Sequence, residues 1–420
     1  MRKLIADFWS DADRTRLECC SMPLPPITAR PHIFYIRPAP GWLDLLYREV
    51  VALVETPLQK YKFEPKVTML KGTVKVHRCD WRQGLEIMLR LTTAHDVEWL
   101  ILESKCTQWS EVDAILKRVP WDSVLPSREA PVHVTSEVFE GFTTASAKLR
   151  ENFCNISGLQ HVSEGAAFRF KIELRTDILR ISVSLCGDPL YKRGYKAKLI
   201  ATAPLPEHQA AACIRWILAQ EKEANPSAVL VPFAGSGTLG FEALIVLSGA
   251  GPGAFSREFA CELFPCTPAA TIGFLRRKLG EKLSIENLPN VFFNDLNEEA
   301  ISVLRENVTA FSKKHCFQVE EGDFFEWRPE LPPEGKILVL LNPPYGNRLA
   351  RNSSISDLYG RIGASVRENL GRYPGRVLGG CICPDELSWR SFLRELRNAK
   401  AETHHFTHGG NEMRLVRWSG

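Results

Sequence analysis

The first part of the chain alternates between strand-like and helix-like spacings of apolar residues. Residues 32–55, HIFYIRPAPGWLDLLYREVVALVE, predict a strand, a Pro-Gly turn and an amphipathic helix whose apolar face is interrupted only by Glu49. Strands are also predicted in VTMLKGTVKVHR (67–78) and EWLILESK (98–105). A strand–helix–strand series of this size is typical of a small α+β unit.

A similar alternation returns between residues 130 and 185. It predicts a strand in APVHVTSEVF, a helix in SAKLRENFCNIS, and two strands in FRFKIEL and LRISVSL with the polar turn RTD between them. The basic stretch YKRGYKAK, residues 191–198, follows. We expect its two tyrosines to pack inside the protein.

From about residue 208 onward, apolar strands alternate regularly with helices. The helical segments AAACIRWILAQ and TLGFEALIVL flank the strand that opens AVLVPFAGSG. Later strands are predicted in NVFFND, HCFQVEEGD, KILVLLN and GRVLGGCIC. This alternation predicts an α/β fold with a Rossmann-like, doubly wound parallel sheet.

Composition narrows the class of protein only slightly. The 420 residues suffice for two or three domains, and 45% hydrophobic with 24% charged residues is ordinary for a globular protein. No apolar run approaches the ~20 residues of a membrane span, so we predict no membrane partner. The net charge of +4 permits a polyanionic partner without requiring one.

Cysteine usage indicates a compartment. The twelve cysteines include no CxxC pair, so no metal site is predicted. The start, MRKLIADFW, lacks the apolar core of a secretory signal. We therefore expect an intracellular protein with reduced thiols, either cytoplasmic or mitochondrial.

Candidate chemistry begins at a glycine-rich turn. VLVPFAGSGTLGFEAL places Gly235, Gly237 and Gly240 between a strand and a helix. A GxxxxGK[ST] phosphate loop is excluded because no lysine follows. A dinucleotide site needs an acid about 20 residues further on, at the end of the next strand, but the next strand here comes much later. A tight turn without a ligand is one interpretation. The other is a ligand such as S-adenosylmethionine (SAM), which glycines allow the backbone to approach closely.

Two aspartates follow in the order that a SAM site requires. The ribose hydroxyls need a carboxylate at the end of the second strand, where Asp295 stands, and the adenine amino group needs an acceptor after the third, where Asp323 stands. Taken alone, each aspartate is better explained as a helix cap or turn residue. Their order behind the glycine loop favours SAM.

The fourth strand of this series ends in LVLLNPPYGNRL, residues 338–349. Consecutive prolines end the strand and leave Asn342 at the edge where ligands bind in open parallel sheets. The Asn342 side-chain oxygen and the Pro343 carbonyl can accept hydrogen bonds from an amine on an aromatic base, and Tyr345 can stack on that base. A base within a duplex must first be flipped out. A plain turn explains these residues alone, but not their order behind the glycine loop and the two acids.

This order, PFAGSGT, Asp295, Asp323 and NPPYGNRL, resembles class I SAM-dependent methyltransferases that methylate amines. GDPLYKRGYK followed by APLPEHQAAA is similar to the junction between a THUMP RNA-binding domain and the catalytic domain of bacterial guanine-N2 methyltransferases of large-subunit ribosomal RNA. IRPAPGWLDLLYREV resembles the ferredoxin-like segment that opens those proteins, and VPWDSVLPSREAPVHV their THUMP segment. The resemblance covers about residues 31–420.

These features together predict a domain order. It comprises an N-terminal arm (1–30), a ferredoxin-like domain (31–92), a THUMP domain (93–190), a basic linker (191–207) and a methyltransferase domain (208–420).

The resemblance also implies roles for individual residues. The target guanine would be held by Asn342, Pro343, Pro344 and Tyr345. SAM would be bound by Pro232, Gly235, Ser236, Gly237, Thr238, Asp295 and Asp323. Separately, four basic residues near the domain junction are candidates for contact with RNA phosphates, with a solvated linker as the alternative: Lys192, Arg193, Lys196 and Lys198.

The expected activity is methyl transfer from SAM to guanine N2, with ribosomal RNA or a preribosomal particle as partner. A transfer RNA or an adenine amine is an open alternative. Val231 stands where the family has an acid that helps to hold the methionine amino group, and Pro206 and His208 replace a lysine and a small polar residue. A second hypothesis is therefore a non-catalytic RNA-binding protein of the same fold that acts in ribosome assembly.

Overall fold

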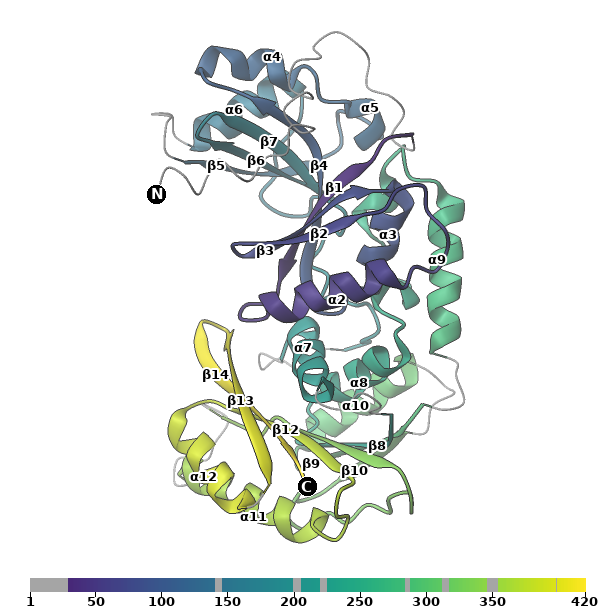
Figure 1. Cartoon of the computed structure of the whole chain (residues 1–420), viewed down its shortest axis with the longest axis vertical. Helices are drawn as coiled ribbons and strands as arrows, with labels where there is room; N and C mark the ends of the chain where they lie inside the picture. Colours follow the sequence, from purple (N-terminus) through teal and green to yellow (C-terminus); the bar gives the residue numbers. More distant parts are fainter. Residues whose placement is uncertain are drawn as a thin grey trace.

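The computed structural model describes residues 29–139, 146–198, 205–219, 225–283, 288–311, 317–345, 354–397 and 399–420. Except for its last two positions, the predicted N-terminal arm lies outside these residues. Two seven-stranded sheets, one in each half of the chain, form the framework (Figure 1). No helix among the described residues is long and apolar enough to span a membrane.

The N-terminal half contains a mixed sheet. Its strands, in spatial order, are β2 (Lys66–Leu70), β3 (Thr73–Cys79), β1 (His32–Pro38), β4 (Ala94–Lys105), β7 (Ile178–Ser184), β6 (Phe168–Arg175) and β5 (Val132–Val138). All neighbouring strands are antiparallel except β5 and β6. Because β4 pairs with both β1 and β7, the regions predicted as ferredoxin-like and THUMP domains share one continuous sheet.

Helices pack on one face of this sheet. Strands β1 and β6 bury every second residue over most of their length, which leaves the intervening, mostly polar residues on the other face. Among the described residues, the helices of this half are α2 (Leu43–Glu55), α3 (Trp81–Arg90), α4 (Val112–Leu116), α5 (Trp121–Val124) and α6 (Ser146–Ser157), with a 3₁₀ turn, η3 (Trp109–Glu111). Apolar side chains of α2, α3 and α6 join those of the strands in one hydrophobic core.

The C-terminal half contains the predicted doubly wound sheet. Its strands, in spatial order, are β10 (Phe317–Glu321), β9 (Asn290–Asp295), β8 (Pro226–Pro232), β11 (Lys336–Leu341), β12 (Val377–Cys383), β14 (Asn411–Ser419) and β13 (Lys400–His408). The first five are parallel, and β14 pairs antiparallel with both β12 and β13. The prediction of parallel strands wound with helices is therefore confirmed, with an antiparallel hairpin added at one edge.

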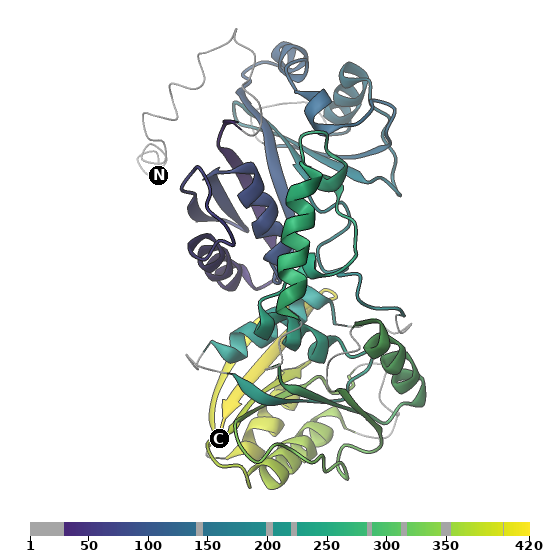
Figure 2. The same cartoon turned by 90° about the vertical axis from the view of Figure 1, so that its right-hand side faces the viewer.

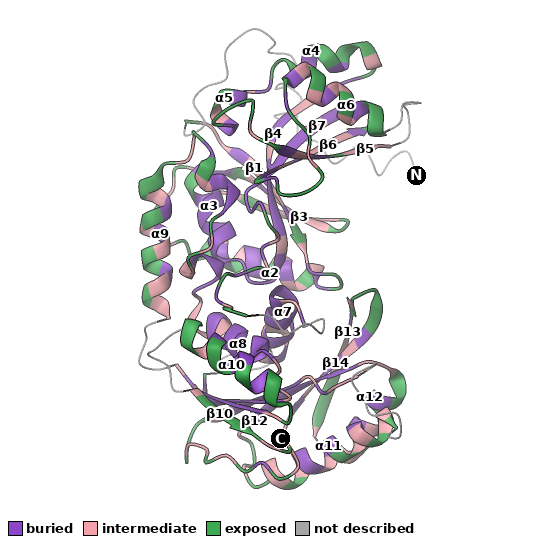
Figure 3. Cartoon of the chain, turned by 180° about the vertical axis from the view of Figure 1, so that it is seen from behind, coloured by how far each residue is buried: buried purple, intermediate pink, exposed green. Residues whose placement is uncertain are grey.

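Helices cover both faces of this second sheet. One face carries α7 (Glu207–Leu218), α8 (Thr238–Ser248) and α10 (Glu298–Phe311), and the other carries α11 (Ile355–Leu370) and α12 (Glu386–Leu396). Adjacent β8 residues enter opposite cores: Val231 lies with α7 and α8, whereas Leu230 lies with α11 and α12. Figure 3 shows the buried residues concentrated in the strands and on the inner sides of these helices.

The two halves exchange segments across their boundary. The connection from α8 to β9 contains η4 (Pro252–Ala254), η5 (Ala260–Leu263) and α9 (Ala269–Lys282). Helix α9 lies beside α3 (Figure 2), and Phe264 and Leu275 belong to the N-terminal core. Conversely, the indole of Trp42, before α2, stacks on His404 of β13 with ring centroids 4.1 Å apart. Part of the predicted methyltransferase domain thus packs inside the N-terminal half.

Candidate active site

The predicted site residues follow four strands that end at one edge of the C-terminal sheet. The glycine loop follows β8, Asp295 is the last residue of β9, Asp323 comes two residues after β10, and Asn342 directly follows β11. These strands are adjacent and parallel, so their carboxyl ends meet at the same edge. The topology therefore brings together residues that lie more than a hundred positions apart in the sequence.

Asp295 is bonded directly to the glycine loop. The Gly235 N–H donates to Asp295 Oδ2 at 2.8 Å, and the Asn297 N–H donates to Asp295 Oδ1 at 3.0 Å. A carboxylate offers about four acceptor positions, so roughly two stay available for a ligand's hydroxyl groups. The turn role and the ligand role that the sequence suggested for Asp295 are thus compatible.

The three glycines of the loop serve different purposes. Gly235 has φ +53°, and a Cβ placed on it would meet no atom within 4 Å, so open space adjoins its backbone. A Cβ on Gly237, at φ +88°, would lie 2.5 Å from Leu304, and one on Gly240 would lie 2.3 Å from the Phe293 ring. Gly235 therefore provides the open approach for a ligand, whereas the other two permit close packing of α8 on its neighbours.

The other predicted cofactor residues form the walls around this loop. Pro232, Ser236 and Thr238 are buried, and Thr238 is the first residue of α8. Val231 is fully buried in the apolar core between β8 and the helices, so this position offers no carboxylate. Helix α8 presents its N-terminal backbone N–H groups at this end, which is the favourable end for a negatively charged group.

Asp323 lies at the exposed rim of the edge. Its Oδ1 accepts a hydrogen bond of 2.9 Å from the Phe325 N–H, the turn role that the sequence offered as an alternative. The Phe324 ring packs on Phe233, with centroids 5.0 Å apart, and Phe233 has a positive φ of 59°. Asp323 keeps acceptor positions toward solvent next to these two rings.

Asn342 carries a buried acceptor without a donor. Its Oδ1 is buried and receives no hydrogen bond from the residues that the structure describes. Pro343 is buried, Pro344 is half-buried, and Tyr345 packs partly against the core that includes α8. Leaving such an acceptor unsatisfied costs roughly 1–3 kcal/mol, which a ligand N–H would offset.

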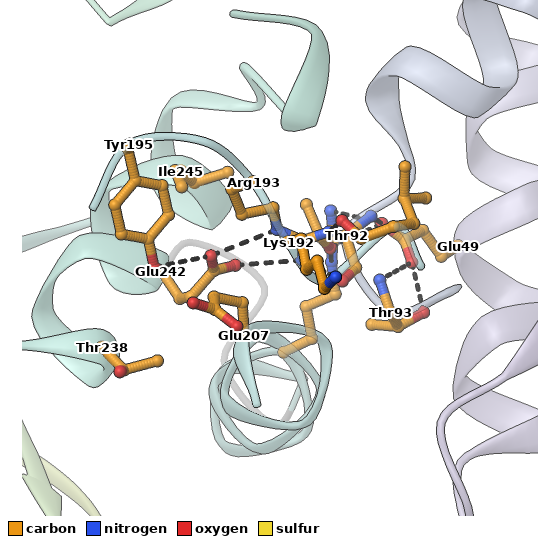
Figure 4. Close-up of polar contacts among 12 residues, drawn as sticks. Glu49, Thr92, Thr93, Lys192, Arg193, Tyr195, Glu207, Thr238, Glu242 and Ile245 are labelled. Carbon is orange, nitrogen blue, oxygen red and sulfur yellow. Dashed lines mark hydrogen bonds and ion pairs between the residues drawn. The ribbon is translucent and has the colours of Figure 1, made fainter. Parts of the chain in front are cut away.

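Two of the four residues predicted to contact RNA lie inside the protein. Arg193 is 1% exposed and pairs with Glu242 at 3.2 Å (Figure 4), and the Lys196 side chain is 6% exposed and pairs with Glu207 at 2.7 Å. The phosphate role is therefore corrected for Arg193 and Lys196, because their charged groups are buried in ion pairs that an RNA phosphate does not reach. Lys192 and Lys198 are exposed, as a phosphate contact requires.

The sequence did not predict the buried polar network around Arg193, apart from the burial of Tyr195. Glu242 of α8 accepts hydrogen bonds from Arg193 and from the hydroxyl of Tyr195, which is buried as the sequence predicted. Burial raises the pKa of the Glu242 carboxyl, while the Arg193 charge opposes that shift. Burial also raises the pKa of the Tyr195 phenol well above its usual value. The signal in the sequence was a single acid in the otherwise apolar helix TLGFEALIVL.

Known proteins share this sequence pattern and this fold. Residues 193–413 match the model of the family UPF0020, described as the RMKL-like methyltransferase domain. Ribosomal RNA large subunit methyltransferase K/L of Acinetobacter baumannii (strain ACICU) is 34% identical over 195 residues, which are 45% of this chain and 26% of that relative. The chain thus matches about a quarter of the length of this curated relative.

Solved structures resemble the chain over nearly its whole length. SMU.472, crystallised as a complex with SAH, has a TM-score of 0.73 at 17% identity, and the match covers 93% of this chain and 98% of that chain. A Listeria monocytogenes protein described as a predicted N6-adenine-specific DNA methylase has a TM-score of 0.72 at 19% identity. That match covers 94% of this chain and 97% of the Listeria chain. These structures confirm the predicted SAM-dependent methyltransferase fold.

Proposed function

Since the chain belongs to the UPF0020 family of RMKL-like methyltransferase domains, we propose that it is an RNA methyltransferase that uses SAM. Its target is the exocyclic N2 amine of a guanine, in large-subunit ribosomal RNA. The similarity to ribosomal RNA large subunit methyltransferase K/L supports this class of substrate. The choice of guanine N2 as the target atom rests on the resemblance of the Asn-Pro-Pro-Tyr turn and the domain junction to guanine-N2 methyltransferases of ribosomal RNA.

The residues at the sheet edge fit SAM as a ligand. Gly235 leaves open space beside the loop backbone, and Asp295 keeps acceptor positions for ribose hydroxyls. Asp323 lies at the rim, where an adenine amino group needs an acceptor. When bound, SAM supplies an electrophilic methyl group on its sulfonium. Pro232, Ser236, Gly237 and Thr238 complete the proposed binding residues.

The observation that carries the proposal is the buried Oδ1 of Asn342, which accepts no hydrogen bond from any residue in the described part of the chain. An amine on a purine is a poor nucleophile because its lone pair is delocalised into the ring. Asn342 Oδ1 and the Pro343 carbonyl accept the two amine hydrogens, which favours the pyramidal amine that attacks the methyl group. Pro344 and Tyr345 orient the base, the tyrosine by stacking. The methylated amine is acidic and loses its proton late, so no strong general base is needed.

The N-terminal half is the proposed docking unit for RNA. This proposal keeps the predicted ferredoxin-like domain (31–92), THUMP domain (93–190) and linker (191–207) as functional regions. Lys192 and Lys198 are exposed at the start and end of the basic stretch and are the proposed phosphate contacts. Such contacts strengthen binding without selecting a sequence.

A labelled-methyl assay tests the proposal. Purified protein with labelled SAM and unmodified ribosomal RNA is expected to yield N2-methylguanine. Asn342→Ala removes the side-chain oxygen that accepts an amine hydrogen. It is expected to lower kcat by about 10²–10³-fold while SAH affinity stays unchanged. Glu368→Ala, on the surface of α11 with a side chain that is 68% exposed, is the control and should keep full activity. Parallel reactions with transfer RNA determine which RNA is the substrate. Absence of SAH binding in calorimetry would contradict the proposal.

Val231 favours a second candidate function. An apolar, fully buried side chain stands where the resemblance expects an acid for the methionine amino group. A non-catalytic ribosome assembly factor would tolerate this change, because it needs the fold and the RNA contacts but no cofactor. This candidate predicts preribosomal particle binding without SAM and an unchanged cellular phenotype for Asn342→Ala. A lost phenotype in that variant would favour the enzyme instead.

A further inference from the structure

The basic stretch, residues 191–198 and here called the junction segment, contacts the glycine loop and helix α8 at several points. Lys196 Nζ donates to Thr238 Oγ1 at 2.8 Å, and the Tyr195 hydroxyl donates to Glu242 Oε1 at 3.1 Å, one helical turn further on. The Lys198 N–H donates to Asn307 Oδ1, whose amide in turn donates to the Ser236 carbonyl at 3.2 Å. The junction segment thus contacts both the loop and the helix start.

The same segment is bound to the N-terminal half. Arg193 donates to the Thr92 carbonyl, and the Thr92 hydroxyl donates to Glu49 at 2.7 Å. Arg215 of α7 joins them, with 2.9 Å between its guanidinium and the Glu49 carboxylate. Figure 4 shows Arg193 between Glu242 on one side and Thr92 on the other. The segment is therefore held on both sides and has little freedom to shift.

Lys196 occupies an electrostatically unfavourable position for stability alone. Its ammonium lies 2.8 Å from the first residue of α8, at the positive end of the helix dipole. Glu207, at 2.7 Å, compensates this charge, and the Lys196 side chain is 6% exposed. A buried ion pair of this kind adds little stability compared with an apolar pair of the same size. Its geometric effect is to fix the Thr238 hydroxyl, and with it the first turn of α8.

We propose that Lys196 is a positioning residue for the cofactor loop. By holding Thr238, it fixes the first turn of α8 and the adjacent glycine loop, in which the Gly237 N–H donates to the Ala234 carbonyl at 2.9 Å, in the geometry that binds SAM, without contacting the ligand itself. The inference rests on the proposed function and deepens it. It means that SAM affinity depends on a side chain of the junction segment, which lies before the strand and loop of the proposed SAM site.

Calorimetric titration of the full chain with SAH tests this role. Lys196→Met keeps the side-chain length and removes the donor, and SAH affinity is expected to fall about tenfold, as for loss of a charge-assisted hydrogen bond. Lys196→Arg keeps charge and donors and should recover most of the affinity. Lys278→Met is the control, because the Lys278 side chain is 45% exposed on α9 and pairs with Glu281 at the surface. RNA affinity of Lys196→Met should equal that of the wild type.

The outcomes separate this inference from the proposed function. Unchanged SAH affinity in a folded Lys196→Met protein overturns the inference alone. A wild-type protein that binds no SAH contradicts the proposed function and the inference together. If circular dichroism shows that Lys196→Met is unfolded, the double variant Lys196→Met/Glu207→Gln removes the same contact without leaving the Glu207 charge unpaired. An unchanged SAH affinity in this double variant overturns the inference equally.

Discussion

Single charged residues on apolar helix faces hold the two halves of this molecule together. Glu49 is 5% exposed and accepts hydrogen bonds from Thr92 and Thr93. Burial would raise the pKa of its carboxyl, but the Arg215 charge and these hydrogen bonds outweigh burial and lower the pKa. A buried charge of this kind is stable only while its partners stay in place. An acid that interrupts an apolar face is therefore a useful sign of an internal polar contact.

His208 is a second single residue with a predicted effect, in this case on how protein stability depends on pH. Burial lowers the pKa of this imidazole well below its usual 6.5, and the nearby Arg193 charge lowers it further. Below pH 6.5 the unfolded chain therefore binds more protons at His208 than the folded chain does. The contribution of His208 to the free energy of unfolding is fully present above that pH and is lost as the pH falls, by up to about 1.4 kcal/mol per pH unit. His208→Phe, which keeps an aromatic ring to stack on Tyr191, should flatten this slope between pH 6.5 and 5.

Urea unfolding at a series of pH values measures this effect. His405 provides the control: it is exposed and pairs with Glu412 at the surface, so His405→Gln should change the slope far less than His208→Phe does. Equal slopes for wild type and His208→Phe would show that His208 does not set the acid sensitivity.

At the scale of elements, the sequence was informative wherever a local pattern decides the structure. Strand ends in a parallel sheet share one edge, so Asp295 and Asn342 could be assigned to a common site from strand order alone. The basic stretch was different, because its local charge contains no information about Glu242 and Glu207, the acids that Arg193 and Lys196 meet in the fold. The sequence pattern could not predict contacts between residues that lie far apart in the chain.

The packing of α8 on β9 gives a prediction for one element. A Cβ on Gly240 would lie 2.3 Å from the Phe293 ring, so Gly240→Ala should lower the free energy of unfolding by about 1–3 kcal/mol through overpacking. Gly273, exposed in the middle of α9, has no atom within 4 Å of such a Cβ. Gly273→Ala should therefore stabilise the protein by about 0.5–1 kcal/mol, the ordinary gain in helix propensity. Thermal unfolding of both variants measures the contrast, and destabilisation by both would contradict it.

At the scale of the whole molecule, the chain does not divide where its sequence patterns change. The connection between α8 and β9 contributes Phe264, Ile272, Leu275 and Leu279 to the core of the N-terminal half. Trp42 lies in the opposite core, against Phe406 and His404 of the C-terminal hairpin. Each half therefore completes its hydrophobic core with a segment of the other, and their stabilities should be coupled.

Phe264 tests this coupling, because it is encoded between two strands of the C-terminal sheet but packs in the other half. It is 2% exposed, and its ring lies 6.0 Å from Phe168 and 6.5 Å from Trp99 of the N-terminal sheet. Phe264→Ala should cost about 3–5 kcal/mol, the usual cost of removing a buried phenyl ring. Amide hydrogen exchange should then show lost protection in β4 and β6, where these partners lie.

The adjacent Leu263 gives the matched control for that experiment. It is 49% exposed, so Leu263→Ala should change the free energy of unfolding by no more than about 0.5 kcal/mol and leave exchange in β4 and β6 unchanged. Loss of protection confined to β8 and β9 in Phe264→Ala would contradict the coupling, because it would mean that the connection stabilises only the sheet that encodes it. Loss in β4 and β6 would instead mean that the proposed RNA-docking half depends on the methyltransferase half for its core.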